Sequence, residues 1–194
     1  MPRLDPVPDR DATLGTKIAY FFTKRRFVRM TGRAPASMLE PLQIYAHIPK
    51  LLSGYGRLEQ AVAGLDLLDR RHRALAELKA ATTTRCEYCI DMGSQIARGW
   101  GLRNEELLAL PNFGEAACFS EVDRLVLRYA TAMSRTPVDV SDELFAALRR
   151  HFDTARLVEL THVIALENLR ARFNLALGIG AAGFSEGAVC ARPD

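Results

Sequence analysis

A long segment with helical spacing near the end of the chain most constrains the fold. Between Asp153 and Gly178, apolar residues recur every three or four positions, as expected for one buried face of a long helix. The members of this run are Leu157, Leu160, Val163, Ile164, Leu166, Phe173, Leu175 and Leu177. No segment of the chain shows the short alternating apolar runs of a β-strand. We therefore predict an all-α fold.

Several shorter helical patterns begin with residues that cap helices. Asp66 or Asp69, Ser120 and Ser141 each precede an apolar helical pattern, and short polar side chains of this kind accept hydrogen bonds from the first backbone N–H groups. Ser120 also stands three positions before Asp123, which is the spacing of a capping arrangement. These signals predict separate helices between about residue 69 and residue 149.

The chain is expected to form one domain with an extension at each end. Residues 1–35 are interpreted as an N-terminal arm and helix, residues 36–180 as the helical domain, and residues 181–194 as a mobile tail. The segment from Leu14 to Met30 mixes apolar and basic residues. We interpret it as a helix that packs on its own domain or on a neighbouring subunit, rather than one that binds a membrane or an acidic partner.

The composition is that of a globular protein. The 194 residues are 48% hydrophobic and 25% charged, and the formal net charge of +3 is too small to indicate a nucleic-acid partner. No window approaches the ~18 unbroken apolar residues of a membrane span. The first residues lack the apolar core of a secretory signal. We therefore expect a cytoplasmic protein that binds neither nucleic acid nor membrane.

Two of the four cysteines stand three positions apart, in the segment from Thr82 to Ser94. We expect them at the start of a helix that runs to about Arg98, where positions three apart share a face. Cys86 and Cys89 would then lie close enough to form a disulfide. A helix N-terminus favours the thiolate form of a cysteine. A thiolate with a second thiol beside it can be oxidised and then resolved as a disulfide.

Three other interpretations of this pair are open from the residues alone. A zinc site needs two further ligands at suitable spacing, whereas Cys118, Cys190 and the histidines are isolated in the sequence. A thioredoxin-type dithiol would follow a strand in an α/β unit, but helical patterns flank this pair. The cysteines could also be buried as small hydrophobic residues without chemistry. We favour a redox pair because the polar neighbours Arg85, Glu87 and Asp91 suggest a helix end that reaches solvent.

The segment around the pair resembles a known family. Residues 75–79 (LAELK) followed by residues 86–94 (CEYCIDMGS) are similar to the core of the carboxymuconolactone decarboxylase/AhpD-like alkylhydroperoxidase superfamily. Residues 167–179 resemble the family's last helix, so the similarity covers roughly residues 36–180. The resemblance implies an AhpD-like helical bundle that assembles into a homo-oligomer, commonly a trimer or a hexamer.

The resemblance also implies roles for the two cysteines. In the peroxidase branch of the family, the second cysteine attacks the peroxide and the first resolves the product as a disulfide. Carried over, Cys89 is peroxidatic and Cys86 is resolving. The implied partners are a hydroperoxide, or another small-molecule substrate, and a dithiol reductant protein that reopens the disulfide; no cofactor or metal is implied.

The sequence departs from the family at its proton relay. The family's histidine, four residues after the second cysteine, is replaced by Gly93, and its glutamate, twelve residues before the first cysteine, is replaced by Ala74. Glu77, one turn further along the same helix, is a possible substitute. Since general acid–base help is typically worth ~10²–10⁴ in rate, we expect a weak peroxidase. The alternatives are a decarboxylase-like enzyme acting on a lactone or ring acid, and a non-catalytic helical oligomer.

Overall fold

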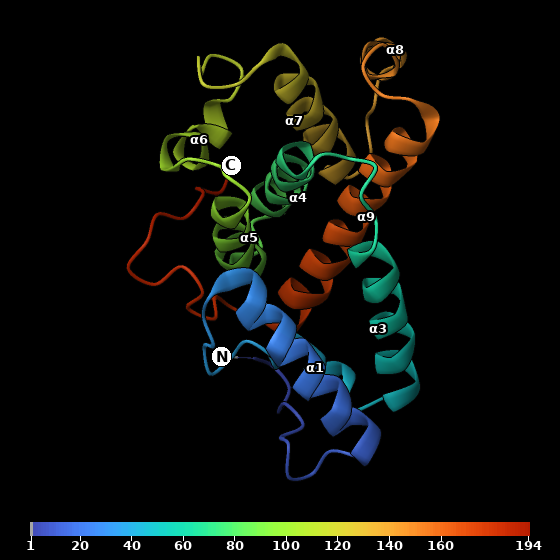
Figure 1. Cartoon of the computed structure of the whole chain (residues 1–194), viewed down its shortest axis with the longest axis vertical. Coiled ribbons are helices and arrows are strands. Elements are labelled where there is room, and N and C mark those ends of the chain that lie inside the picture. The colour runs from blue at the N-terminus through green and yellow to red at the C-terminus, as the bar shows by residue number, and fades with distance from the viewer. Residues whose placement is uncertain (1) are drawn as a thin grey trace.

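The computed structural model describes residues 2–194, and every regular element within this range is a helix (Figure 1). The predicted all-α fold is thus confirmed. The elements, in chain order, are α1 (Leu14–Thr31), α2 (Glu40–Tyr45), α3 (Pro49–Ala63), α4 (Arg70–Thr84), α5 (Glu87–Gly99), α6 (Asn104–Ala109), the 3-10 helix η1 (Leu110–Asn112), α7 (Glu121–Ser134), α8 (Asp142–Arg149) and α9 (Thr154–Leu177).

The helices begin where the capping residues predict. Asp69, Ser120, Ser141 and Asp153 are the N-caps of α4, α7, α8 and α9, and each side chain accepts a hydrogen bond from the backbone N–H three residues ahead. The Asp123 carboxylate in turn accepts a hydrogen bond from the Ser120 N–H, which completes a capping box. Local hydrogen bonding therefore sets these helix starts.

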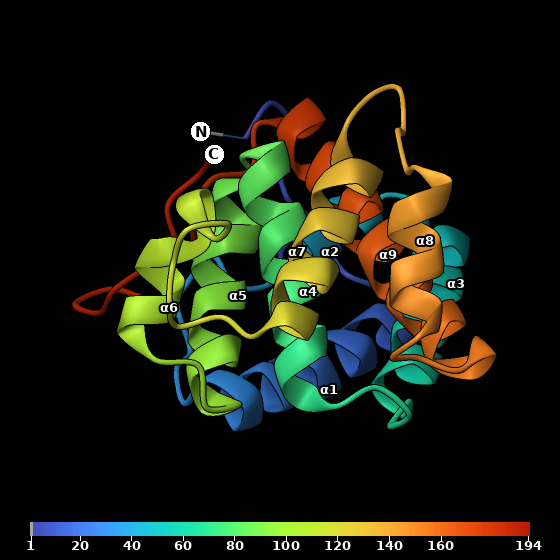
Figure 2. The same cartoon turned by 90° about the horizontal axis from the view of Figure 1, so that it is seen from above.

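The central helix of the bundle is α4, which packs against α5, α7 and α9. Seen from above, α4 lies between α5 on one side and α7 and α9 on the other (Figure 2). Leu75 and Leu78 on α4 are buried completely or almost completely. Because α5 follows α4 after a short turn, this packing fixes where the cysteine segment lies.

One narrow side of α1 faces the bundle. Thr16, Tyr20 and Thr31 are buried, whereas several large apolar side chains on the same helix are exposed; these are Leu14, Ile18, Phe21, Phe22 and Val28. The helix therefore packs on its own domain only in part. The exposed apolar side chains are available for a neighbouring subunit, and the expected homo-oligomer stays a prediction. No helix in the described part of the chain combines the length and apolar character needed to cross a bilayer.

The C-terminal tail is held on α5 by a buried carboxylate. The two Asp91 side-chain oxygens accept hydrogen bonds from four consecutive backbone N–H groups, those of residues 182–185, at 2.6 to 3.0 Å. Phe184 is fully buried, and the Ser94 hydroxyl accepts a bond from the Ala191 N–H at 3.0 Å. The expectation of a mobile tail is therefore wrong for these residues, because sequence composition did not reveal their partner on α5.

Candidate active site

The cysteine pair lies at the corner between α4 and α5. Arg85 ends α4 in the left-handed conformation (φ 59°), which turns the chain back so that the Cys86 N–H donates to the Ala81 carbonyl at 3.1 Å. Cys86 is the N-cap of α5, and Cys89 lies in the first turn of that helix. The two residues form a disulfide, with their Cα atoms 5.2 Å apart. The predicted position of the pair at a helix start is confirmed.

Both cysteines are more buried than their neighbours suggested. Their exposed fractions are 0% for Cys86 and 3% for Cys89, although Arg85 and Glu87 beside them are exposed. The prediction that this end of the helix reaches solvent is thus correct for Arg85 and Glu87. It is wrong for the cysteines and for Asp91, which is 5% exposed because the C-terminal tail covers it. The reason is that positions 86 and 89 share the inward face of α5, whereas position 87 lies on another face.

Asn174 on α9 brings a polar group to the buried pair. Its side-chain nitrogen donates toward both sulfurs, at 3.8 Å from Cys86 Sγ and 3.7 Å from Cys89 Sγ. The backbone N–H of Cys89 also donates to Cys86 Sγ, at 3.3 Å. The sequence reasoning missed Asn174. The signal that would have found it is its place on the inward stripe of α9, three residues after the buried Ala171.

Tight packing of α5 on α4 accompanies the loss of the family's histidine at position 93. A Cβ atom at Gly93 would lie 3.2 Å from Leu78 Cδ1, which is closer than ordinary van der Waals contact. Ala74, at the other relay position, is 4% exposed and packs in the same core. Both relay positions therefore contribute to helix packing in this chain.

Glu77, the possible substitute, belongs to an ion-pair cluster. Its carboxylate accepts from Arg73 Nε at 3.3 Å and lies 4.0 Å from Arg170 Nη1. Arg170 also bonds Glu167 at 2.9 Å and Glu59 at 2.8 and 2.9 Å. Within residues 2–194, the structure shows no hydrogen bond from Glu77 to either sulfur. Its role as a proton relay stays a prediction.

The cluster shifts the pKa values of two of its carboxyl groups, Glu59 and Glu167, in opposite directions. Burial alone would raise the pKa of Glu59, but the charge and hydrogen bonds of Arg170 outweigh it and lower that pKa. Burial raises the pKa of Glu167 to about 7; Arg170 opposes this rise, and the negative charge of Glu77 adds to it. Glu167 is therefore a buried carboxyl group that exchanges a proton near neutral pH.

Replacing Glu167 with glutamine is expected to flatten the pH dependence of stability. Between pH 4.5, the ordinary pKa of a glutamate, and about pH 7, the unfolded chain releases a proton from Glu167 that the folded chain keeps. The free energy of unfolding therefore falls as pH rises through this window, by up to about 3 kcal/mol, and this part of the loss is absent in Glu167→Gln. Urea denaturation at pH 5, 6, 7 and 8 measures it.

The exposed Glu115 offers a control for this comparison. Glu115→Gln should follow the wild-type curve across the whole pH range. Parallel curves for Glu167→Gln and wild type would show that Glu167 does not titrate between pH 5 and 8.

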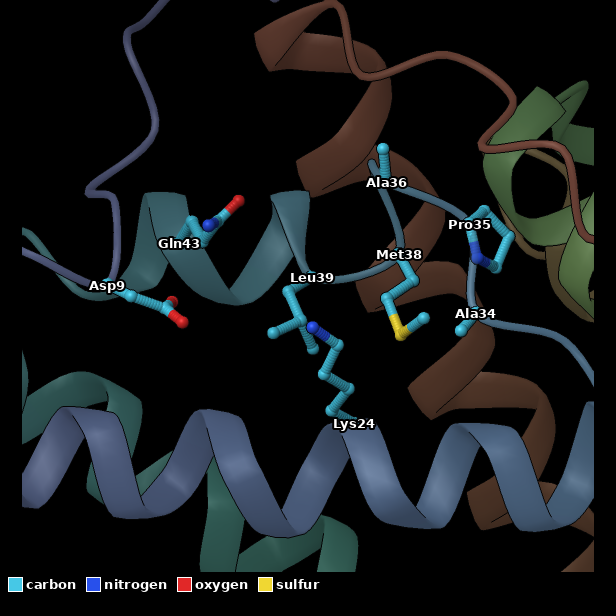
Figure 3. Close-up of a pocket in the computed structure, with 8 residues that line it drawn as sticks. All are labelled: Asp9, Lys24, Ala34, Pro35, Ala36, Met38, Leu39 and Gln43. Atoms are coloured by element: carbon cyan, nitrogen blue, oxygen red, sulfur yellow. The ribbon is translucent and has the colours of Figure 1, made fainter.

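A cavity of about 280 Å³ lies between α1 and the segment before α2 (Figure 3). It is lined by Asp9, Lys24, Ala34, Pro35, Ala36, Met38, Leu39 and Gln43. The Met38 carbonyl accepts a hydrogen bond from the Tyr88 hydroxyl at 2.5 Å, and Tyr88 stands between the two cysteines. Neither cysteine lines this cavity. Its connection to the cysteine segment is the hydrogen bond between Tyr88 and Met38.

Comparison with known proteins places the chain in a family. A family model described as the carboxymuconolactone decarboxylase family matches residues 49–132, which include both cysteines. The Escherichia coli protein YnjA, described as uncharacterized, is 38% identical over 151 residues, which are 75% of this chain and 81% of YnjA. The chain belongs to the carboxymuconolactone decarboxylase/AhpD-like superfamily.

Solved structures agree with an AhpD-like fold. The debrominase Bmp8 in its apo form matches with a TM-score of 0.75 and 22% identity, covering 92% of this chain and 91% of Bmp8. A peroxidase-related protein from Ralstonia eutropha with an alkylhydroperoxidase AhpD core matches with a TM-score of 0.73 and 16% identity, covering 93% and 92% of the two chains. At these identities the likeness establishes the fold, and the AhpD-like bundle predicted from the cysteine segment is confirmed.

Proposed function

We propose that this AhpD-like protein reduces hydroperoxides through a dithiol–disulfide cycle at Cys86 and Cys89. The observation that carries the proposal is the disulfide at the first turn of α5, with N–H donors directed at both sulfurs. A thiolate formed there gains from the helix N-terminus and from these donors. The family membership supports the same assignment.

In the oxidative half of the cycle, Cys89 is the attacking sulfur, as in the peroxidase branch of the family. Its thiolate attacks one peroxide oxygen, the O–O bond breaks, and the alkoxide leaves as an alcohol after taking a proton. The resulting Cys89 sulfenic acid is attacked by the Cys86 thiolate, which forms the disulfide and releases water once a proton is taken up. A dithiol then reduces the disulfide and is itself oxidised.

Two features of the site predict slow turnover. With Gly93 and Ala74 at the relay positions, no imidazole is available there to move protons, and general acid–base help of ~10²–10⁴ is lost unless another group, such as Glu77, supplies it. The sulfurs are also almost fully buried, so a substrate reaches them only when the covering segments open.

Thiol titration tests the proposal directly. The fully reduced protein is treated with a small excess of an alkyl hydroperoxide, and free thiols are counted before and after. We expect the loss of two thiols per chain, because each turnover converts both sulfurs to a disulfide, and their recovery on addition of a dithiol. A variant with Cys118→Ser and Cys190→Ser should lose the same two thiols. A constant thiol count in that variant would refute the cycle.

The same protein preparations separate the other candidate functions. Turnover of a lactone acid that survives both Cys86→Ser and Cys89→Ser would favour a decarboxylase-like enzyme. Loss of halide from a bromopyrrole, with two thiols oxidised for each carbon–bromine bond replaced by carbon–hydrogen, would favour a dehalogenase; a cysteine-to-alanine variant of the debrominase Bmp8 has been solved with 2,3,4-tribromopyrrole. No turnover in any of these assays would favour a non-catalytic helical oligomer.

A further inference from the structure

The hydrogen bonds around the disulfide are not shared equally between the two sulfurs. Cys86 Sγ accepts from two donors, the Cys89 backbone N–H at 3.3 Å and the Asn174 amide at 3.8 Å. Within residues 2–194, the structure gives Cys89 Sγ one such donor, the Asn174 amide at 3.7 Å. Cys86 is also the N-cap of α5. The surroundings therefore favour negative charge on Cys86 Sγ over negative charge on Cys89 Sγ.

This asymmetry bears on how the disulfide is reduced. In thiol–disulfide exchange, an incoming thiolate bonds to one sulfur and the other sulfur leaves as a thiolate. Exchange is faster when the departing sulfur is the better stabilised anion. Backbone and side-chain N–H donors, together with the positive end of a helix, provide such stabilisation. The attacked sulfur should then be the one with fewer donors.

We infer that a dithiol reductant attacks Cys89 Sγ and that Cys86 departs as a thiolate held by the Cys89 N–H and the Asn174 amide. The inference rests on the proposed dithiol–disulfide cycle and assigns its reductive half. The electron pair of the breaking S–S bond goes to Cys86 Sγ while the new S–S bond joins the reductant to Cys89. The second reductant thiol, after losing its proton, displaces Cys89 thiolate and leaves as part of an oxidised, disulfide-bonded reductant.

This assignment makes Cys89 the sulfur that meets outside molecules in both halves of the cycle. It attacks the hydroperoxide in one half and is attacked by the reductant in the other, whereas Cys86 reacts only with Cys89. The burial of the two residues agrees with this division, since Cys89 is 3% exposed and Cys86 is 0% exposed. The Cys89 N–H distinguishes the two sulfurs, whereas the Asn174 amide lies within reach of both, so Asn174 is then a positioning residue that stabilises the departing thiolate.

Trapping the intermediate tests the inference. The oxidised Cys118→Ser/Cys190→Ser protein is mixed briefly with glutathione, quenched in acid, alkylated with N-ethylmaleimide and sequenced by tandem mass spectrometry. We expect glutathione on Cys89 and the alkyl group on Cys86, in about tenfold excess over the reverse pattern, because hydrogen bonds to a charged group are worth at least that factor. Equal labelling, or glutathione mainly on Cys86, would overturn the assignment.

A second measurement examines Asn174. Asn174→Leu removes the donor at similar volume and should slow reduction of the disulfide by glutathione about tenfold. Asn168→Leu is the matched control, since the side-chain nitrogen of this buried residue on the same helix donates its hydrogen bonds to the Ser134 hydroxyl and the Ile164 carbonyl, and to neither sulfur. Equal reduction rates for the two variants would contradict the role of Asn174.

The single-cysteine proteins keep the inference testable if Asn174→Leu does not fold. In the Cys118→Ser/Cys190→Ser background, Cys86 as the sole cysteine (with Cys89→Ser) should be alkylated by iodoacetamide at lower pH than Cys89 as the sole cysteine (with Cys86→Ser). The reverse order would count against the inference. Failure of this inference can be told apart from failure of the proposed function. If glutathione labels Cys86 while peroxide still removes two thiols, only the inference fails. If glutathione labels Cys89 but the protein consumes no peroxide, only the proposed function fails.

Discussion

Replacing Cys89 with serine is expected to abolish hydroperoxide consumption, whereas replacing Cys86 should leave a single turnover. Serine cannot act as the attacking thiolate at position 89, so neither the sulfenic acid nor the disulfide forms. In Cys86→Ser, the Cys89 thiolate can still attack one peroxide, but the sulfenic acid cannot be resolved within the chain. Stopped-flow measurement of peroxide loss should show one equivalent consumed per chain in Cys86→Ser and none in Cys89→Ser.

The other two cysteines supply the control for this pair of variants. Cys118 and Cys190 are partly buried and unpaired with any other cysteine, and their joint replacement by serine should leave peroxide consumption at the wild-type rate. The assignment of Cys89 as the attacking sulfur fails if Cys89→Ser still consumes one equivalent. Reversed behaviour of the two variants would exchange the roles of Cys86 and Cys89.

The largest loss of stability should follow from replacing Asp91 with alanine. Four backbone N–H groups of the tail, those of residues 182–185, lose their acceptors at once, and two of these residues, Phe184 and Ser185, are almost fully buried. A buried donor left without a partner costs about 1–3 kcal/mol, so we expect Asp91→Ala to lower the free energy of unfolding by about 4 kcal/mol or more. Urea denaturation measures this loss.

Two milder changes calibrate the Asp91 result. Asp91→Asn keeps the size and one acceptor oxygen, and its cost should be intermediate. Ser94→Ala removes only the bond from the Ala191 N–H and should cost about 1 kcal/mol. Hydrogen exchange identifies the site of the damage, because the amides of residues 182–185 should lose protection in Asp91→Ala. Unchanged protection there would show that other contacts hold the tail.

The sequence was most informative where structure is decided locally. Asp69, Ser120, Ser141 and Asp153 bond to backbone groups three residues away, so their effect could be predicted without knowing the rest of the fold. The placement of Cys86 and Cys89 on one face of a helix start follows from helical geometry in the same way. These local signals, together with the family resemblance, led to the correct fold.

The missed features all depend on residues far apart in the chain. Asn174 approaches Cys86 only because α9 packs beside α5, and no local pattern encodes that contact. Asp91 appeared to be a charged residue near a helix end, yet its partners lie more than 90 positions later in a segment whose composition suggested mobility. The burial of both sulfurs likewise results from the assembled bundle. Single-sequence reasoning lacks the distances that decide such cases.

The ion-pair cluster around Arg170 fixes the axial register of the last helix. Arg170 binds Glu59 on α3 and Glu167 on its own helix, while Glu159 near the start of α9 accepts from the backbone N–H groups of residues 67 and 68. A slip of α9 by one residue would translate Asn174 by about 1.5 Å and rotate it by about 100°. Such a slip would carry the amide away from both sulfurs. Polar contacts elsewhere on α9 therefore determine whether the disulfide keeps its only side-chain donor in residues 2–194.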